Sequence, residues 1–337
     1  MEFSKKTRIG IFIALIIAII IFPHIVDDNY ITRVATLCLM YSALAISLNL
    51  VSGFMGQVSL GHAGFLGIGA YTSAILSAKF ELPFLVTALI AILMAALFGL
   101  IVGIPSLKLS GSYLAVVTLG FSEVVRLIEL NWVSLTRGPM GITGIDRPII
   151  FGIKIKSPES YYYLALVLLL INIFFIGNII NSHIGRAIMA IREDAVAASS
   201  MGINVFKYKV IVFVISAAFT GLMGAFYAHY MRFIDPSAFN FEQSTGVLGM
   251  VILGGMGSLP GSIIGATALS IIPEVLRQLS ETRMLVYGLV IVFMTIFKPK
   301  GICGNTSFKS LLGLKKKYAV PDEPDVEKAF EKYGKVI

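Results

Sequence analysis

The chain has 337 residues, of which 57% are hydrophobic and only 14% are charged, and its formal net charge at pH 7 is +8. Soluble domains carry about 25% charged residues, so this composition excludes an ordinary soluble enzyme and argues against nucleic acid as the partner of the positive charge. Apolar runs of about 20 residues recur, each long enough to cross a bilayer of about 30 Å. The sequence predicts an all-α polytopic membrane protein with lysines and arginines in its cytoplasmic loops.

The first apolar run, Ile9 to Val26, follows a basic N-terminus with Lys5, Lys6 and Arg8. A secretory signal has a similar charged start, but this run is too long for one and no small-residue cleavage site follows it. We interpret it as an uncleaved first span with a cytoplasmic N-terminus. Six further spans are predicted at Arg33 to Val51, Leu60 to Ala78, Phe84 to Ile104, Tyr113 to Leu130, Tyr161 to Ile180 and Val210 to Tyr230.

Two loops between these spans are distinctive. Residues 131–160 are polar and contain several glycines and prolines, which predicts an ordered external loop. Residues 182–209 predict a short amphipathic helix, because Ile188, Ile191 and Ala195 share one helical face. Gly202 is the expected stop of that helix.

The segment from Gly246 to Leu276 is too long for one span and is interrupted by GGMGSLPG, Gly254 to Gly261. A single span would place the lysine-rich C-terminus outside, whereas a hairpin of two shorter segments places it inside. We prefer the hairpin because the cluster Lys315–Lys317 is costly to place outside.

With a last span at Met284 to Phe297, the prediction is about ten hydrophobic segments with both termini in the cytoplasm. The 182–209 loop then also faces the cytoplasm. The chain divides into a transmembrane domain, residues 1–304, and a charged cytoplasmic tail, residues 305–337.

Two stretches of the chain are weakly similar, Ser59 to Ile75 and Gly257 to Ile272. Each follows a glycine-rich break and continues as a helix rich in small residues. We interpret them as parts of inverted repeats, whose broken or re-entrant helices meet around a pathway near the midplane. The alternative is that glycine is simply common in membrane helices.

Several polar and small residues near these breaks are candidates for the translocation pathway. Polar groups at membrane depth tend to face the bundle interior or a water-filled path, although each can equally make an interhelical hydrogen bond. Small residues leave room for a pore, or alternatively let helices pack closely. The candidates are Asn49, Gln57, Ser59, His62, Gly254, Gly255 and Gly257.

Charged residues on the fifth span form a second candidate site. Glu123, Arg126 and Glu129 recur every three residues near the predicted outer end, so Glu123 and Arg126 can pair. The alternatives are a structural ion pair and a contact to substrate or to an external docking protein. No catalytic constellation, metal-ligand spacing or phosphate-binding loop occurs in the sequence, so we predict a non-enzymatic chain without a metal.

The 182–209 loop resembles the coupling loop of ABC importer permeases, whose motif has the form EAA-x-x-x-G. Ala197, Ala198 and Gly202 occupy the Ala-Ala and Gly positions, whereas Val196 stands where the motif has Glu. Three charged residues lie just before the motif, and we count them with the loop's contacts to an ATPase: Arg192, Glu193 and Asp194.

Six ordered sequence blocks between about Thr32 and Ile302 are similar to the LivM-type permease family of branched-chain amino-acid ABC transporters. The blocks are LNLVSGFMGQVSLGHAGFLGIGAY, SGSYLAVVTLGFSEVVRLIELNW, LTRGPMGITGI, AIREDAVAASSMGIN, MVILGGMGSLPGSIIGA and FKPKGI.

This resemblance implies a permease subunit of an ATP-driven importer with a type II importer-like fold in a prokaryotic inner membrane. It implies a second homologous permease, two ATP-binding cassette subunits that bind ATP and Mg, and an extracytoplasmic solute-binding protein. The chain itself would hold no cofactor. Urea or short-amide permeases share these blocks and remain an alternative, as does an ion-coupled secondary transporter, which would need intramembrane acids such as Glu123 or Glu274.

Overall fold

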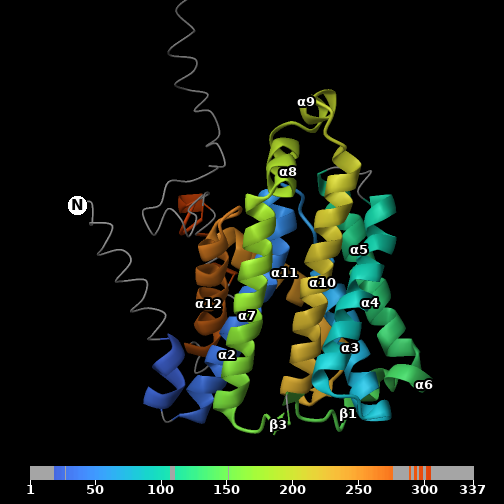
Figure 1. Ribbon diagram of the computed structural model, residues 1–337, viewed down its shortest axis with the longest axis vertical. Helices are drawn as coiled ribbons and strands as arrows, with labels where there is room; N and C mark the ends of the chain where they lie inside the picture. Colours follow the sequence, from blue (N-terminus) through green and yellow to red (C-terminus); the bar gives the residue numbers. More distant parts are fainter. Residues whose placement is uncertain are drawn as a thin grey trace, which may run out of the picture.

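The computed structural model describes residues 19–26, 28–106, 111–150 and 152–275, with 288–289, 292–293, 296–298 and 301–304. This part of the chain is a bundle of long helices, with α8 and α9 at one end and the short strands at the other (Figure 1). The α-helices are α2 (Asn29–Asn49), α3 (His62–Phe80), α4 (Phe84–Ser106), α5 (Ser112–Asn131), α6 (Val133–Thr136), α7 (Pro158–Asn181), α8 (His183–Glu193), α9 (Ala195–Ser200), α10 (Val205–Met231), α11 (Phe241–Gly254) and α12 (Leu259–Val275).

Three short helices of other types interrupt this pattern. A π-helix, η1 (Leu50–Phe54), continues α2, and two 3₁₀ turns, η2 (Gly138–Met140) and η3 (Pro236–Phe239), precede β1 and α11. The strands form two antiparallel pairs, β1 (Ile142–Thr143) with β4 (Phe233–Ile234) and β2 (Ile149–Ile150) with β3 (Ile153–Lys154).

Four helical stretches within the described ranges are long and apolar enough to cross a membrane: Asn29–Phe54, Phe84–Pro105, Pro158–Asn181 and Val205–Met231. Each span predicted from Arg33 to Tyr230 coincides with a helix, and the chain is a mostly helical membrane protein. The predicted first and last spans fall largely outside the described residues, as does the tail at 305–337. The count of ten segments and the inverted repeats therefore stay predictions.

The side chains of α4 show how the bundle meets its surroundings. Ala91 and Ala95 are buried on its inner face, while Leu89 and Leu93 are exposed. Small residues inside and large apolar residues outside are the arrangement expected when the surrounding solvent is lipid, because helices then associate through close packing rather than through the hydrophobic effect.

The centre of the bundle is α10, which packs against α3 and α4. Glycines bring these backbones together: a Cβ atom at Gly69 of α3 would overlap the backbone of Gly221, and one at Gly224 would overlap the carbonyl of Leu66. The two helices can therefore approach only because these positions have no side chain.

The segment predicted to be a hairpin consists of two helices, α11 and α12, joined by the turn 255–258. Gly255 and Gly257 have φ values of 115° and 83°, which L-residues with a side chain rarely adopt. The first helix begins at Phe241, earlier than the predicted Gly246, because the Asn240 side chain caps it by accepting a hydrogen bond from Gln243 N at 3.0 Å.

The 131–160 loop is ordered by contacts to the end of α10. Its strand β1 pairs with β4, which follows α10 directly. His229, in the last turn of α10, contacts the Asp146 carbonyl through Nδ1 at 2.7 Å and Ser73 Oγ through Nε2 at 3.0 Å. The loop is thus held to both α10 and α3.

Replacing Gly69 with Ala should destabilise the protein by ~1–3 kcal/mol, because the added methyl group must displace the backbone of Gly221. The matched control is Gly120→Ala on α5, where a Cβ atom meets nothing within 4 Å. Because Ala is the better helix former, that control should be neutral or stabilising by up to about 1 kcal/mol. Unfolding of the purified protein in detergent measures both, and equal stability of the two variants would contradict the packing argument.

Candidate functional site

The 182–209 loop forms two helices rather than the predicted single one. The Ser182 side chain caps α8 by accepting from Ile184 N at 3.1 Å, and Ile188 and Ile191 are buried on its inner face as the periodicity predicts. The helix ends at Glu193, and Asp194, whose backbone is extended, is the N-cap of α9. The prediction was wrong at this residue because an aspartate can act as the cap of a new helix as well as a surface residue of the old one.

Asp194 caps α9 through its side chain. Its carboxylate accepts hydrogen bonds from Val196 N at 2.8 Å and from Ala197 N at 3.0 Å. The backbone donors Ala197 N and Val196 N hold the pKa of Asp194 below its ordinary range, because they stabilise the charged form. The helix N-terminus adds to this preference for a negative charge.

The tip of the loop, formed by α9, lies at one end of the bundle (Figure 1), and it exposes two apolar side chains. Val196 is 77% exposed and Met201 is 84% exposed. Glu193 and Ala197 are exposed beside them, while Ala198 is buried. Gly202 then turns the chain toward α10 with a φ of 84°, and a Cβ atom there would meet nothing within 4 Å.

Arg192 connects this loop to the transmembrane helices. It is half-buried, and its Nη1 atom donates a hydrogen bond to the carbonyl oxygen of Gly53 in η1 at 2.7 Å. A Cβ atom at Gly56 would approach Arg192 Cγ to 2.7 Å, so the arginine stem lies directly against the segment after η1. Sequence reasoning placed Arg192 at the ATPase contact, whereas the structure places its side chain against η1.

Asn49 joins the end of α2 to the turn between α11 and α12, and its side chain is 0% exposed. Its Nδ2 atom donates to the Ser258 carbonyl at 2.9 Å and to Ser262 Oγ at 2.7 Å, and its Oδ1 atom accepts from Gly257 N at 2.9 Å. We call η1, Asn49, Gly254 and the turn 255–258 the broken-helix junction. It contains four of the residues predicted for the pathway: Asn49, Gly254 at the end of α11, Gly255 and Gly257.

The remaining predicted pathway residues lie next to this junction and are also buried. Gln57 N donates to the Val51 carbonyl at 3.1 Å. His62 Nε2 contacts Ser216 Oγ at 2.8 Å, and His62 Nδ1 contacts Ser59 Oγ at 3.4 Å. The structure thus brings the predicted residues together, and in this conformation they contact one another and α10.

The described C-terminal segment 301–304 packs on the same junction. Ile302 N and Cys303 N donate to the carbonyls of Leu253 and Gly254 at 2.9 and 3.1 Å. These bonds satisfy two carbonyl groups that the end of α11 leaves without a helical partner.

The charged residues of α5 separate into two environments. Arg126 Nε lies 2.8 Å from Glu123 Oε2, and both side chains are partly exposed. Glu129 is instead 4% exposed, and among the described residues neither of its carboxylate oxygens has a hydrogen-bond partner. Glu129 lies against Gly67 of α3, as Phe239 does, so Glu123, Arg126 and Glu129 do not act as one charged face.

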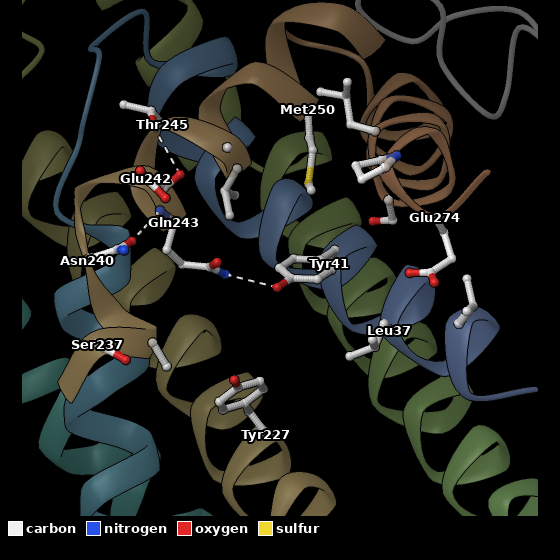
Figure 2. A pocket seen from close by; sticks show the side chains of 17 residues that line it. Leu37, Tyr41, Tyr227, Ser237, Asn240, Glu242, Gln243, Thr245, Met250 and Glu274 are labelled. Carbon is white, nitrogen blue, oxygen red and sulfur yellow. Dashed lines mark hydrogen bonds between the residues drawn. The ribbon is translucent and has the colours of Figure 1, made fainter. Parts of the chain in front are cut away.

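A cavity of about 740 Å³ lies between α2, α11 and α12 (Figure 2). It is distinct from the predicted pathway residues, none of which lines it. Sequence reasoning missed this site, although Asn240 followed by Glu242 is a recognisable helix start. Its polar lining includes Tyr41, Asn240, Glu242 and Gln243.

Comparison with known proteins gives one family. The family model described as "Branched-chain amino acid transport system / permease component" matches residues 30–295. The chain is 37% identical over 317 residues to the high-affinity branched-chain amino acid transport system permease protein LivM of Escherichia coli, covering 87% of this chain and 74% of the relative. It is 26% identical over 292 residues to LivH of the same organism, covering 80% and 93%.

A third relative has a different cargo in its name. The chain is 24% identical over 319 residues to the autoinducer 2 import system permease protein LsrC of Yersinia pseudotuberculosis, covering 90% of this chain and 88% of the relative. No solved structure matches the chain significantly.

The capping of α9 by Asp194 should depend on pH. Because the folded-state pKa is lowered, the charged cap stabilises α9 above the ordinary aspartate pKa, and this contribution is lost as the pH falls through the folded-state pKa. Amide hydrogen exchange in 195–200, corrected for the intrinsic rate, should speed up over that acidic range. The control Asp194→Asn keeps a capping oxygen but cannot titrate, so a pH profile identical to that of the unaltered protein would contradict this role.

Proposed function

Because the chain belongs to the branched-chain amino acid transport system permease family, we propose that it is a transmembrane permease subunit of an ATP-driven ABC importer for aliphatic amino acids. In this role it forms half of the translocation pathway and a second homologous permease forms the other half. The observation that carries the proposal is the α8–α9 loop, which exposes a docking tip at one end of the bundle and contacts the broken-helix junction through Arg192.

Two ATP-binding cassette subunits, which bind ATP and Mg, dock on this loop and on its counterpart in the second permease. Exposed apolar side chains at the end of a bundle are typical of a protein interface, and Val196 and Met201 provide them. Val196 replaces the glutamate of the coupling motif, so the contact to the ATPase is apolar at that position. Glu193 and Asp194 supply the negative charge beside it.

Arg192 transmits the motion of the loop to the transmembrane helices. A shift of α8 moves Arg192, which is hydrogen-bonded to the Gly53 carbonyl. Gly53 packs on Asn49 and on the backbone of Gly257, so the movement reaches the turn between α11 and α12. Packed interfaces of this kind switch between discrete arrangements rather than deforming continuously.

The broken-helix junction is the inner end of the pathway in this proposal. The conformation described here is closed at that level, because Asn49, Ser59 and His62 are buried and contact neighbouring helices. Opening requires α11 and α12 to separate from η1, which exposes these polar groups to the passing substrate. Gly255 and Gly257, which already have positive φ values, allow the backbone of the turn between α11 and α12 to change conformation, and Gly254 is packed against the Gly261 backbone in the closed state.

The full architecture of the proposal has about ten hydrophobic segments, inverted repeats and a type II importer-like fold. Two observations support the repeats: η1 precedes α3 as the turn 255–258 precedes α12, and the two breaks touch through Gly53 and Gly257. Both termini and the α8–α9 loop face the cytoplasm of a prokaryotic cell. The 131–160 loop and the pair Glu123–Arg126 then lie toward the outer side, where an extracytoplasmic solute-binding protein docks.

The proposal is tested by isolating the assembled complex and measuring transport. Purification of the chain from its own membranes should bring with it an ATP-binding cassette ATPase and a second permease, identified by mass spectrometry. The complex in proteoliposomes, supplied with its binding protein, should take up leucine, isoleucine or valine only when ATP is present. Uptake that needs no ATPase and follows a sodium or proton gradient would show a secondary transporter, and uptake of autoinducer 2 or urea instead would overturn the substrate.

Replacing Arg192 with Gln should uncouple ATP hydrolysis from transport, because the hydrogen bond to the Gly53 carbonyl is lost while the docking tip remains. Losing a hydrogen bond to a charged group costs about 1.5–3 kcal/mol, so uptake per ATP hydrolysed should fall about tenfold or more. The matched control Lys207→Gln removes an exposed charge from the first turn of α10, outside the docking tip, and should transport normally. Equal coupling ratios in both variants would refute this link.

A further inference from the structure

The cavity between α2, α11 and α12 has the volume of a small-molecule site. Its volume of about 740 Å³ falls within the range of roughly 300–1,000 Å³ typical of ligand pockets. Helix α2 begins at the end of the bundle that carries the strands (Figure 1). The α2 residues that line the cavity, Val34 to Tyr41, belong to the first half of this helix. The cavity therefore lies in the half of the bundle away from α8 and α9. A transport role for this cavity rests on the proposed import function. None of the residues that line the cavity belongs to the broken-helix junction.

One side of the cavity is polar. Asn240, Glu242 and Gln243 gather there at the start of α11, with Ser237 from the preceding turn (Figure 2). Tyr41 faces them from α2, and its hydroxyl accepts a hydrogen bond from Gln243 Nε2 at 3.4 Å. Asn240 caps α11 through Oδ1, which leaves its amide nitrogen available as a donor toward a bound group.

The other side of the cavity is apolar. Leu37 lies across the cavity from Asn240 and Glu242, and Met250 lies farther along α11 (Figure 2). Val247 and Leu269 complete this wall. A ligand that fills the cavity therefore meets hydrogen-bonding groups at one end and aliphatic groups at the other.

The charge of the lining selects the polar end of that ligand. The lining contains Glu242 and Glu274 but no lysine or arginine. The two carboxylates lie on opposite sides of Tyr41 (Figure 2), and Glu274 already accepts a hydrogen bond from Tyr30 OH. Glu242 is thus the carboxylate that sits among the polar groups, and its natural counter-ion is an ammonium group.

We propose that this cavity binds the transported amino acid in the outer half of the bundle, with the α-ammonium group at Glu242, the α-carboxylate at the Asn240 amide and the Tyr41 hydroxyl, and the aliphatic side chain against Leu37, Val247 and Met250. An aliphatic zwitterion is the chemical class that matches one acidic, hydrogen-bonding end and one apolar end. Glu242 and Asn240 are specificity residues in this assignment, because they read the charged part that all α-amino acids share.

The position of the cavity on α11 fits a transport role. The same helix carries Glu242 and Gln243 at its start and Gly254 at the junction. A substrate held in the cavity therefore contacts the helix whose other end must move for the inner side to open.

The proposal is tested with the assembled complex in proteoliposomes, using Glu242→Gln. The matched control is Glu81→Gln, because Glu81 is an exposed glutamate directly after α3 and lies outside both the cavity lining and the 131–160 loop. ATP-driven uptake of radiolabelled leucine should fall about tenfold or more in Glu242→Gln and stay unchanged in Glu81→Gln. Assembly with the second permease and ATP hydrolysis stimulated by the loaded binding protein should persist in both.

A direct occupancy measurement uses Thr245→Cys, which places a thiol in the cavity lining, in a background without Cys38 and Cys303. Millimolar leucine should slow labelling of this thiol by a charged thiol reagent, whereas 4-methylpentanoate, which lacks the amino group, should not. Adding Glu242→Gln should abolish the protection. Absence of protection by leucine would overturn the assignment. Loss of the second permease from the complex of Glu242→Gln would also overturn it, because Glu242 would then contribute to a contact between subunits. If the unaltered complex takes up no branched-chain amino acid, the proposed function fails instead.

Discussion

The structure depends on satisfying the backbone groups that broken helices leave inside the bundle. Hydrocarbon offers no water to bond an orphaned N–H or carbonyl group, so such a break persists only where protein groups replace the missing partners. Asn49 does this for the turn 255–258, by bonding Gly257 N and the Ser258 carbonyl with one side chain. Arg192 does the same for the Gly53 carbonyl from outside. The breaks and their partners therefore fix where η1, α11 and the α8–α9 loop meet.

Glycine makes these close backbone contacts possible, but a glycine in the sequence does not by itself show which structural role it has. At Gly53, Gly69 and Gly265 a side chain would overlap a neighbouring backbone, so each glycine is required for helix contact. At Gly202 the requirement is the positive φ alone. The same residue type thus allows close packing at one position and an unusual backbone conformation at another, and the sequence alone does not distinguish these two roles.

Much of the helical framework follows from the sequence, because apolar length and flanking polar residues set the spans from Arg33 to Tyr230. The family resemblance is confirmed by the match over residues 30–295, which contains five of the six sequence blocks; the block FKPKGI, residues 297–302, lies beyond the matched range. Contacts between distant segments were not predictable: Arg192 meets Gly53 and Tyr41 meets Gln243 only once the bundle is assembled. The break between α8 and α9 at Asp194 was missed for a different reason, since helix capping depends on the local backbone conformation and not on hydrophobic periodicity.

The 14 residues of α11 connect the two parts of the molecule that transport requires. At 1.5 Å per residue the helix is about 21 Å long, and its internal hydrogen bonds make it move as a unit. Its start lines the cavity and its end forms the junction that Asn49 and Gly53 contact. A change in the α8–α9 loop that tilts α11 therefore alters the cavity as well. By thermodynamic linkage, a ligand that prefers one tilt must also bias the loop by the same free energy.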